Sequence, residues 1–214
     1  MKLKHLEMAL QRISGYDHPR AALEQYQTPA PLAARLLYHA LMKGDIEGKI
    51  VYDLGCGTGV LAIGAALLGA DCVRGVDSDP HAIEGANANA ALLGAHVDFI
   101  VADVRDATLP GRLGSCDTVI MNPPFGAQKA HADRPFIDLA LSIAPVTYSI
   151  FNAGSTQFIE TYTAERAEID ERVGGVFPIK RTFSFHTHDI QEIEVEILRL
   201  IRKQHPGTEA SKIR

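Results

Sequence analysis

The sequence predicts an α/β fold in which a mostly parallel, seven-stranded sheet carries helices on both faces. Short apolar segments alternate with helical segments between residues 49 and 151. This alternation is typical of parallel strands that are joined by crossover helices. Nearer the C-terminus, two extended segments follow one another with no helix between them, which indicates an antiparallel hairpin at one edge of the sheet.

The segments expected to form strands are short and apolar. The first, KIVYDLG at 49–55, enters a glycine-rich turn, as a buried strand does before a loop. The last, IQEIEVEILRLI at 190–201, alternates isoleucine and valine with glutamate, which is typical of a strand with one buried face. The seven expected strands are 49–55, 71–77, 96–103, 116–122, 146–151, 172–185 and 190–201.

Helical periodicity or runs of small apolar residues mark the segments between these strands. A short amphipathic helix is expected at the N-terminus, with its leucines on one face. In the helix after the second strand, Asp79 is the expected N-cap and Pro80 the first helical residue, while Asn89 is expected to be a surface polar group. The other expected helices are 31–43, 59–70, 78–94 and 136–144.

Length, composition and cysteine spacing restrict the class of protein. The 214 residues suffice for one domain with a full core. No apolar run is long enough for a transmembrane helix, and Glu7 and Arg12 interrupt the segment that a signal peptide would keep apolar. Cys56, Cys72 and Cys116 fit neither a disulfide framework nor a zinc spacing. We therefore expect a cytoplasmic, single-domain protein without a membrane span or a metal.

A glycine-rich loop after the first strand is the strongest indication of a cofactor. Gly55, Gly57 and Gly59 allow the backbone to turn sharply and to approach a ligand closely. The dinucleotide fingerprint G-x-G-x-x-G is excluded, because Val60 stands where its third glycine would be. The spacing after Asp53 suits S-adenosylmethionine, whose carboxylate can be received by the loop amides and the N-terminus of the next helix.

Acidic residues also end the next two strands. Asp77 ends the second strand, where a carboxylate can accept hydrogen bonds from both ribose hydroxyls. Asp103 ends the third strand, where it can accept a hydrogen bond from the adenine amine of the cofactor. Helix capping is the alternative role for these residues, since Asp79 and Asp106 occupy similar positions. Acidic residues at three successive strand ends favour the cofactor site.

The segment N-P-P-F at 122–125 follows the fourth strand and predicts a stiff catalytic loop. Pro123 and Pro124 fix two φ angles and disfavour the helical region for the residues before them. The side-chain oxygen of Asn122 and the carbonyl of Pro123 can each accept one N–H of an aromatic amine, which directs its lone pair at a sulfonium methyl group. Phe125 offers a face on which a flat substrate can stack.

The order of these motifs resembles that of amino-methyltransferases, which act on adenine N6, cytosine N4, guanine N2 or glutamine amides. Three motifs together are similar to a narrower family, methyltransferase-like protein five, which methylates adenine N6 in small-subunit ribosomal RNA: Q-Y-x-T-P at 25–29, D-L-G-C-G-x-G-V-L-x-I-G at 53–64 and V-I-M-N-P-P-F-G at 119–126. The likeness runs from about residue 23 to residue 200 and implies a Rossmann-like class I methyltransferase fold. Alone, Thr28 before Pro29 would also be a good helix N-cap.

The resemblance also implies binding residues and partners. Eukaryotic members need a small zinc-bearing activator subunit that adds to the sheet edge, and whether this chain has one stays open. The N-terminal helices within 1–45 are expected to complete the cofactor site, 46–205 to form the Rossmann-like core and 206–214 to form a flexible tail. Asn122 is expected to contact the cofactor as well as the substrate. The cofactor contacts of the family correspond to Gln25, Thr28, Gly55, Thr58, Val60, Asp77, Asp103 and Val104.

Charge and size bear on the substrate. A net charge of -5 disfavours a nucleic-acid enzyme, but the chain has no room for a DNA-recognition domain, which favours an RNA that is recognised by shape. Lys180, Arg181 and His186 are candidates for RNA phosphate contacts or belong to a solvated hairpin. The basic residues between 199 and 214 form either a solubilising tail or a phosphate contact. Methylation of guanine N2, of a DNA amine (adenine N6 or cytosine N4) or of a protein glutamine stays open as an alternative.

Overall fold

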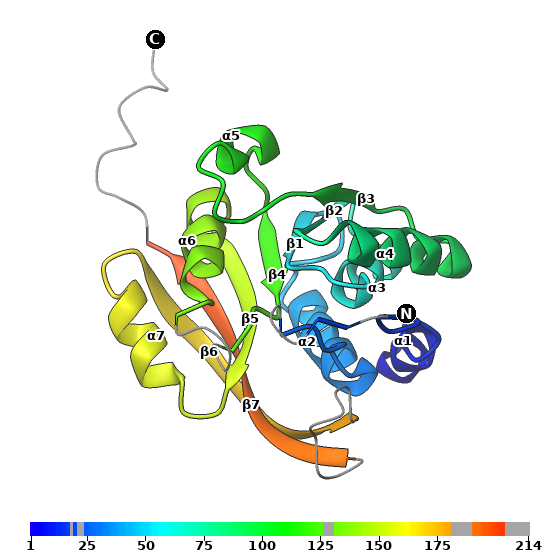
Figure 1. Cartoon of the computed structure of the whole chain (residues 1–214). Coiled ribbons are helices and arrows are strands. Elements are labelled where there is room, and N and C mark those ends of the chain that lie inside the picture. The colour runs from blue at the N-terminus through cyan, green and yellow to red at the C-terminus, as the bar shows by residue number, and fades with distance from the viewer. Residues whose placement is uncertain (18, 21–23, 126–130, 181–189, 204–214) are drawn as a thin grey trace.

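The computed structural model describes residues 1–17, 19–20, 24–125, 131–180 and 190–203 (Figure 1). Its strands are β1 (Ile50–Leu54), β2 (Cys72–Asp77), β3 (Asp98–Val101), β4 (Thr118–Met121), β5 (Val146–Asn152), β6 (Ala167–Lys180) and β7 (Ile190–Arg202). They form one sheet in the order β3-β2-β1-β4-β5-β7-β6. β1 to β5 pair in parallel, whereas β7 is antiparallel to both β5 and β6. The predicted parallel sheet with a C-terminal antiparallel hairpin is therefore confirmed.

Helices cover both faces of this sheet, as Figure 1 shows, and make two apolar cores. They are α1 (Leu3–Leu10), α2 (Ala30–Met42), α3 (Val60–Leu67), α4 (Pro80–Leu93), α5 (Leu109–Leu113), α6 (Arg134–Ile143) and α7 (Thr156–Thr163). α1 to α4 pack on the face that carries Val51 and Ile120, and α5 to α7 pack on the face that carries Tyr52 and Met121. Neighbouring residues of a strand point to opposite faces, so β1 and β4 contribute to both cores.

Two helices were not predicted. α5 contains Pro110 and Gly111, which are poor helix formers, so its five residues show no helical pattern. α7 is short and buries only Ile159 and Thr163, so its apolar face is too small to recognise in the sequence. None of the described helices has both the length and the apolar character needed to cross a membrane.

Two of the basic residues between 199 and 214, Arg199 and Arg202, lie in β7. Arg199 belongs to β7, is 14% exposed, and its guanidinium lies 2.9 Å from a carboxylate oxygen of Asp45. It also bonds to Asp170 at 2.5 Å. The interpretation of Arg199 and Arg202 as part of a solubilising tail is therefore wrong, because both belong to a strand that is paired with β5 and β6. Residues 204–214 lie outside the described residues, and the tail at 206–214 stays a prediction.

The loops that follow β1, β2, β3 and β4 lie at the same end of the sheet, because these strands are parallel neighbours. β1 lies between β2 and β4, so the chain changes direction across the sheet at this point. Ligands of open α/β sheets bind beyond the carboxyl ends of the strands at such a point. Asp53, Asp77, Asp103 and Asn122 lie at or just after the carboxyl ends of β1, β2, β3 and β4.

Candidate functional site

A cavity of about 320 Å³ opens beyond the carboxyl ends of these strands. All of the predicted cofactor residues except Gly59 line it, from Gln25 and Thr28 in the N-terminal segment to Val104 after β3. Of the predicted catalytic segment, Asn122 and Pro124 line the cavity. Pro123 and Phe125 do not. Twelve of the predicted residues therefore line one cavity, although they come from five separate parts of the chain. A sixth part, residues 131–136, also contributes to the wall and was not predicted.

The glycine loop lies so close to its surroundings that side chains would not fit there. Gly57 has a φ of +52°, and a Cβ atom on it would overlap the hydroxyl of Tyr16. A Cβ on Gly55 would lie 2.9 Å from the ring of Phe136. The carboxylate of Asp77 accepts hydrogen bonds from the backbone N–H groups of Gly57 and Asp79, both at 2.9 Å. Asp77 thus holds the glycine loop in place from the end of the neighbouring strand.

Asp53 is an unusual carboxylate at the base of the cavity. It is 1% exposed, and one oxygen accepts the backbone N–H of Ala62 at 2.9 Å. Its other oxygen has no hydrogen-bond partner among the described residues. Burial raises the pKa of Asp53 to about 8, and the nearby carboxylate of Asp77 adds to this effect. An unpartnered, buried acceptor that borders a cavity is suited to receive a positively charged donor.

The N-terminal segment is fixed over the cavity by buried polar side chains. The Gln25 amide donates to Asp79 at 2.8 Å and accepts the backbone N–H of Arg20 at 2.8 Å. Asp79 also caps α4 by accepting from the backbone of His81, so its predicted role as N-cap is confirmed. These contacts place Tyr16 and Tyr26 in the cavity wall, neither of which was predicted.

Asn89 is a second anchor for the same segment. Its side chain accepts from the Ser14 N–H at 3.0 Å and donates to the Ser14 carbonyl at 3.1 Å and the Thr58 carbonyl at 3.0 Å. It is 3% exposed, so the prediction that Asn89 is a surface group is wrong. Asn89 joins the N-terminal segment to the glycine loop, and nothing in the local sequence of α4 indicates a partner 75 positions away.

The side-chain amide of Asn122 has a hydrogen-bond partner for its nitrogen but none for its oxygen among the described residues. Its amide nitrogen donates to the hydroxyl of Thr28 at 3.0 Å, while its side-chain oxygen is buried with no partner among the described residues. Thr28 is not the N-cap of α2, because that position belongs to Pro29. Phe125 packs against Tyr26, with ring centroids 5.6 Å apart at 42°. The loop thus leaves one side-chain acceptor of a cavity-lining residue without a partner among the described residues.

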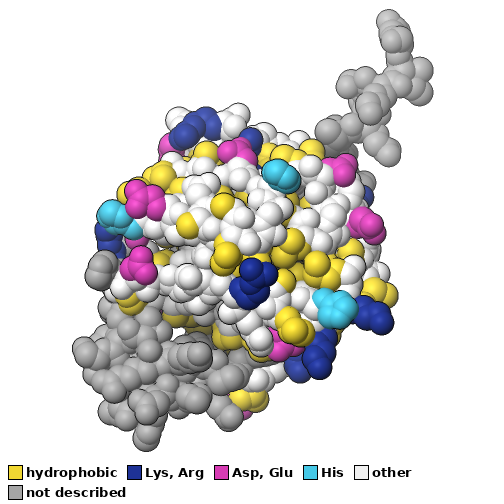
Figure 2. All heavy atoms as spheres, turned by 90° about the vertical axis from the view of Figure 1, so that its right-hand side faces the viewer, with side chains coloured by type: hydrophobic (Ala, Val, Ile, Leu, Met, Phe, Trp, Pro, Cys, Tyr) yellow, Lys and Arg dark blue, Asp and Glu magenta, His cyan; other side chains and the backbone are white. Residues whose placement is uncertain are grey.

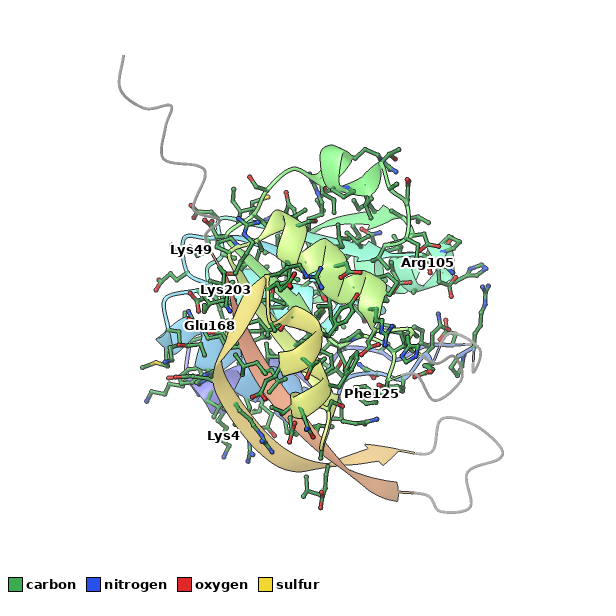
Figure 3. The ribbon with its side chains drawn as sticks, turned by 90° about the vertical axis from the view of Figure 1, so that its left-hand side faces the viewer. Lys4, Lys49, Arg105, Phe125, Glu168 and Lys203 are labelled. Atoms are coloured by element: carbon green, nitrogen blue, oxygen red, sulfur yellow. The ribbon has the colours of Figure 1, made fainter. Side chains whose placement is uncertain are left out.

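Asp103 has a different environment from the one predicted. Both of its oxygens accept from the guanidinium of Arg105, at distances of 2.5 to 3.0 Å. Asp103 is 39% exposed and Arg105 is 63% exposed, and Figure 3 shows Arg105 at the outer side of the molecule. Arg105 was not predicted, although it stands two residues after Asp103 and also lines the cavity. An adenine amine at Asp103 would share a carboxylate that an arginine already binds.

The predicted substrate residues cannot be placed in this site. Lys180 is the last residue of β6, and Arg181 and His186 lie outside the described residues. Among the residues that the structure describes, no group of three histidine, cysteine or acidic side chains is arranged to hold a metal ion.

Comparison with known proteins gives relatives over nearly the whole chain. Residues 31–142 match the family described as methyltransferase small domain. The chain is 35% identical to the rRNA N(6)-adenosine-methyltransferase Mettl5 of Drosophila melanogaster, over 93% of this chain and 96% of that protein. The crystal structure of a proposed RNA methyltransferase from Pyrococcus horikoshii is 39% identical, with a TM-score of 0.86, and covers 94% of this chain and 98% of its own.

A more distant structure carries a cofactor. Magnesium protoporphyrin IX methyltransferase from Synechocystis, solved with bound S-adenosylmethionine, is 18% identical with a TM-score of 0.64, over 92% of this chain and 90% of its own. At this identity the likeness shows a shared fold. That methyltransferase binds S-adenosylmethionine on a fold similar to the one described here.

Proposed function

Because the chain belongs to the same family as the rRNA N6-adenosine methyltransferase Mettl5, we propose that it methylates N6 of an adenine in RNA, with S-adenosylmethionine as the donor. The substrate is proposed to be small-subunit ribosomal RNA. The observation that carries the proposal is the buried, unpartnered side-chain oxygen of Asn122 in the wall of the cavity. An exocyclic amine has N–H groups to donate, and this oxygen is an acceptor that nothing else in the described residues satisfies.

The residues of the cavity fit S-adenosylmethionine. The unpartnered oxygen of Asp53 can accept from its ammonium group, and the glycine loop, which lines the cavity at Gly55 and Gly57, can receive the amino-acid tail. Asp77 keeps lone pairs for the ribose hydroxyls after accepting its two backbone bonds. When bound, this cofactor supplies a methyl group on a positively charged sulfur. These assignments account for the buried acceptors at the carboxyl ends of β1 and β2.

The chain contributes orientation rather than a strong base. An aromatic amine is a weak nucleophile because its lone pair is delocalised into the ring. Asn122 would accept one of its N–H groups, which favours a pyramidal nitrogen with its lone pair free. The second predicted acceptor, the Pro123 carbonyl, belongs to a residue that does not line the cavity. Pro123 and Pro124 stiffen the loop that carries Asn122 before the substrate arrives. Preorganised acceptors of this kind lower the barrier without further rearrangement.

The product identifies the substrate. Ribosomal RNA that lacks the modification is incubated with the protein and a labelled methyl donor, digested to nucleosides and separated. We expect label in N6-methyladenosine. Label in a methylated guanosine would overturn the choice of adenine. It would remain consistent with amine positioning by the loop at 122–125, because guanine N2 is also a planar exocyclic amine. Label in methylglutamine alone would overturn the nucleic-acid substrate, and label in DNA but not RNA would overturn the choice of RNA.

The surface suggests that RNA recognition needs more than this chain. Basic and acidic side chains are interspersed over the face shown in Figure 2, and the net charge is -5. Affinity for nucleic acid depends on neutralising phosphates with clustered basic groups. We therefore propose that a structured ribosomal substrate or a small zinc-bearing activator subunit supplies part of the interface.

The edge strand β3 is the proposed site of such a subunit. Among the strands that the structure describes, β3 pairs with β2 alone, and Val101 at its end is 49% exposed. The opposite edge, β6, has an irregular register between Ile169 and Glu171, and such bulges oppose pairing with another strand. We expect Val101→Asp to abolish co-purification of a zinc-bearing partner from the native cell, and Val173→Asp on β6 to leave it intact. A zinc content near zero for the native complex would contradict this proposal.

Binding of the donor should release a proton. With a pKa of about 8, Asp53 is mostly protonated at neutral pH in the cofactor-free protein. An adjacent ammonium group favours the ionised form, so the pKa should fall on binding and most of one proton should leave. Calorimetry at about pH 7 in buffers of different ionisation enthalpy measures this release, and affinity should rise as the pH increases from about 6 to 8.

The control is Asp53→Asn, which removes the titrating group and should abolish most of the proton release. Asp77 also has a pKa raised by burial, so a release that persists in Asp53→Asn would belong to Asp77. Asp53 should also affect how the free energy of unfolding depends on pH, in the direction opposite to that of a carboxylate whose pKa is lowered by folding. Because the folded-state pKa of Asp53 lies above the ordinary 3.8, its contribution to stability is present at low pH and is lost as the pH rises through about 8.

A further inference from the structure

We propose that Arg134, the first residue of α6, binds a backbone phosphate of the RNA beside the nucleotide that enters the cavity. The inference rests on the proposed function, because it names a contact with the proposed substrate. α6 leads back into β5, which is parallel to β4, so the start of α6 lies at the same end of the sheet as the cavity. The neighbours of Arg134 at positions 131, 132, 135 and 136 line the cavity. Arg134 therefore stands at its rim.

The guanidinium of Arg134 has no acceptor among the described residues. A guanidinium is positively charged and carries five N–H donors. The side chain of Arg134 is half-buried, and its Nε is buried without a hydrogen-bond partner among the described residues. Buried donors normally have a partner, so an acceptor from outside the described residues would complete this arrangement.

The acidic residue best placed to pair with Arg134 is engaged elsewhere. Asp138 stands four positions later in α6, which is the spacing of ion pairs along a helix. Its carboxylate instead accepts from the guanidinium of Arg166 at 2.7 Å and from the hydroxyl of Tyr162 at 2.9 Å. The fold thus directs Asp138 to α7 and leaves the charge of Arg134 for another partner.

Two other arginines near the cavity differ from Arg134 in this respect. Arg105 lines the cavity, and its guanidinium lies 2.5 Å from a carboxylate oxygen of Asp103. The guanidinium of Arg20 lies 3.7 Å from a carboxylate oxygen of Asp79. In a chain with a net charge of -5, acidic groups are in excess, so an arginine that pairs with none of those described is the one best suited to an anion from another molecule.

Two aromatic rings of α7 hold this guanidinium in place. The Cζ of Arg134 lies 5.3 Å from the ring centroids of both Phe158 and Tyr162. These two rings stack on each other, with centroids 5.5 Å apart and planes at 21°. α6 and α7 lie side by side, as Figures 1 and 3 show. An arginine that is already held against aromatic rings loses less side-chain entropy when it binds an anion.

A phosphate is the anion that the proposed reaction brings to this rim. An adenine that enters the cavity has to leave its stack, while its ribose and the phosphates on either side stay at the cavity mouth. The planar fork of a guanidinium matches two oxygens of one phosphate. Such a contact positions the backbone without reading its sequence, which agrees with an RNA that is recognised by shape.

The test measures binding of small-subunit ribosomal RNA that lacks the modification, at salt concentrations from about 50 to 200 mM. We expect Arg134→Gln to raise the dissociation constant about tenfold, as for a lost hydrogen bond to a charged group. The slope of log affinity against log salt should become shallower by about 0.7 to 0.9, the value for one phosphate. Arg134→Lys keeps the charge and loses the fork, so it should weaken binding only about threefold and keep most of the slope.

Two further variants test the location and the aromatic support. Lys203→Gln is the matched control for loss of one positive charge, because Lys203 is exposed and follows the end of β7 that pairs with the start of β5, away from the cavity. It should leave affinity and slope within about twofold of the wild type. Phe158→Leu removes one of the two rings and should weaken RNA binding about two- to fivefold.

A purely structural role would give a different pattern. If Arg134 only held α7 against α6, Arg134→Gln would lower the free energy of unfolding and leave the salt slope unchanged, and the inference would be overturned. Unchanged RNA affinity with loss of a co-purifying protein would also overturn it, because the partner of Arg134 would then be an acidic protein group. If Arg134→Gln does not fold, wild-type RNA affinity in both Arg134→Lys and Phe158→Leu would be the contrary result.

Steady-state kinetics separate this inference from the proposed function. In Arg134→Gln the KM for RNA should rise about tenfold, while kcat at saturating RNA stays within about threefold of the wild type. A fall in kcat with an unchanged KM would remove Arg134 from substrate binding. A wild-type protein that methylates no RNA would overturn the proposed function, and the binding titration would still decide whether Arg134 contacts a phosphate.

Discussion

Replacement of Asn122 by alanine should reduce the rate of methyl transfer by roughly a hundredfold or more, the scale of a lost preorganised polar group. The affinity for S-adenosylmethionine should stay within about threefold of the wild-type value. The side-chain oxygen of Asn122 is buried with no partner among the described residues, so the variant loses the acceptor that we propose for the substrate amine. Single-turnover kinetics with labelled donor measure the first effect, and calorimetry measures the second.

The control for Asn122→Ala is its free energy of unfolding compared with that of the wild type. Among the described residues the Asn122 amide makes one hydrogen bond, to Thr28, and the variant should lose only about 0.5 to 1.5 kcal/mol of unfolding free energy. A thermal unfolding curve close to that of the wild type would show that the active site, and not the fold, is affected. A rate that fell less than about tenfold would mean that Asn122 does not hold the amine.

The sequence predicted the sheet well because each strand carries its own pattern. β1 and β4 are buried on both faces and therefore appear as continuous apolar runs. In β7 the alternation does not reflect one exposed face throughout, because Glu196 is 3% exposed and its carboxylate accepts hydrogen bonds from Thr156 and Arg172. The parallel pairing and the final hairpin followed from the alternation with helices and its end after 151, whereas the strand order β3-β2-β1-β4-β5-β7-β6 was not predicted. α5 and α7 were missed because neither buries enough apolar side chains to produce a helical period.

The site was predicted unevenly for a similar reason. Residues whose role depends on a strand end or a glycine turn, such as Asp53 and Gly57, are visible in a local motif. Asn89 is not, because its role depends on Ser14, which the tertiary fold brings to it. Thr28 was assigned to the site by family resemblance, but its contact with Asn122 has no local signal. Arg105 could have been found, since an arginine two residues after an acidic strand end is within reach of that carboxylate.

Replacement of Asp77 by alanine should weaken S-adenosylmethionine binding by about 1 to 3 kcal/mol, which corresponds to roughly 5- to 150-fold in the dissociation constant. Two effects combine. The variant loses the acceptor proposed for the ribose hydroxyls, and it also frees the backbone N–H groups of Gly57 and Asp79 that the carboxylate now binds at 2.9 Å. The glycine loop and the start of α4 would both lose an anchor. Calorimetric titration of wild type and variant with the same donor measures the loss.

A cofactor analogue separates the two effects. An S-adenosylhomocysteine that lacks the 2′-hydroxyl removes the ribose contact and leaves the glycine loop intact. We expect the wild-type protein to bind this analogue about tenfold more weakly than the complete molecule, as for a lost hydrogen bond to a charged group, and Asp77→Ala to bind both with nearly equal affinity. If Asp77→Ala still distinguished the two ligands as strongly as the wild type, the carboxylate would organise the loop without contacting the ribose. Unchanged affinity for the complete cofactor in Asp77→Ala would place the binding site elsewhere, because no other carboxylate among the described residues bonds to the backbone of the glycine loop at Gly57.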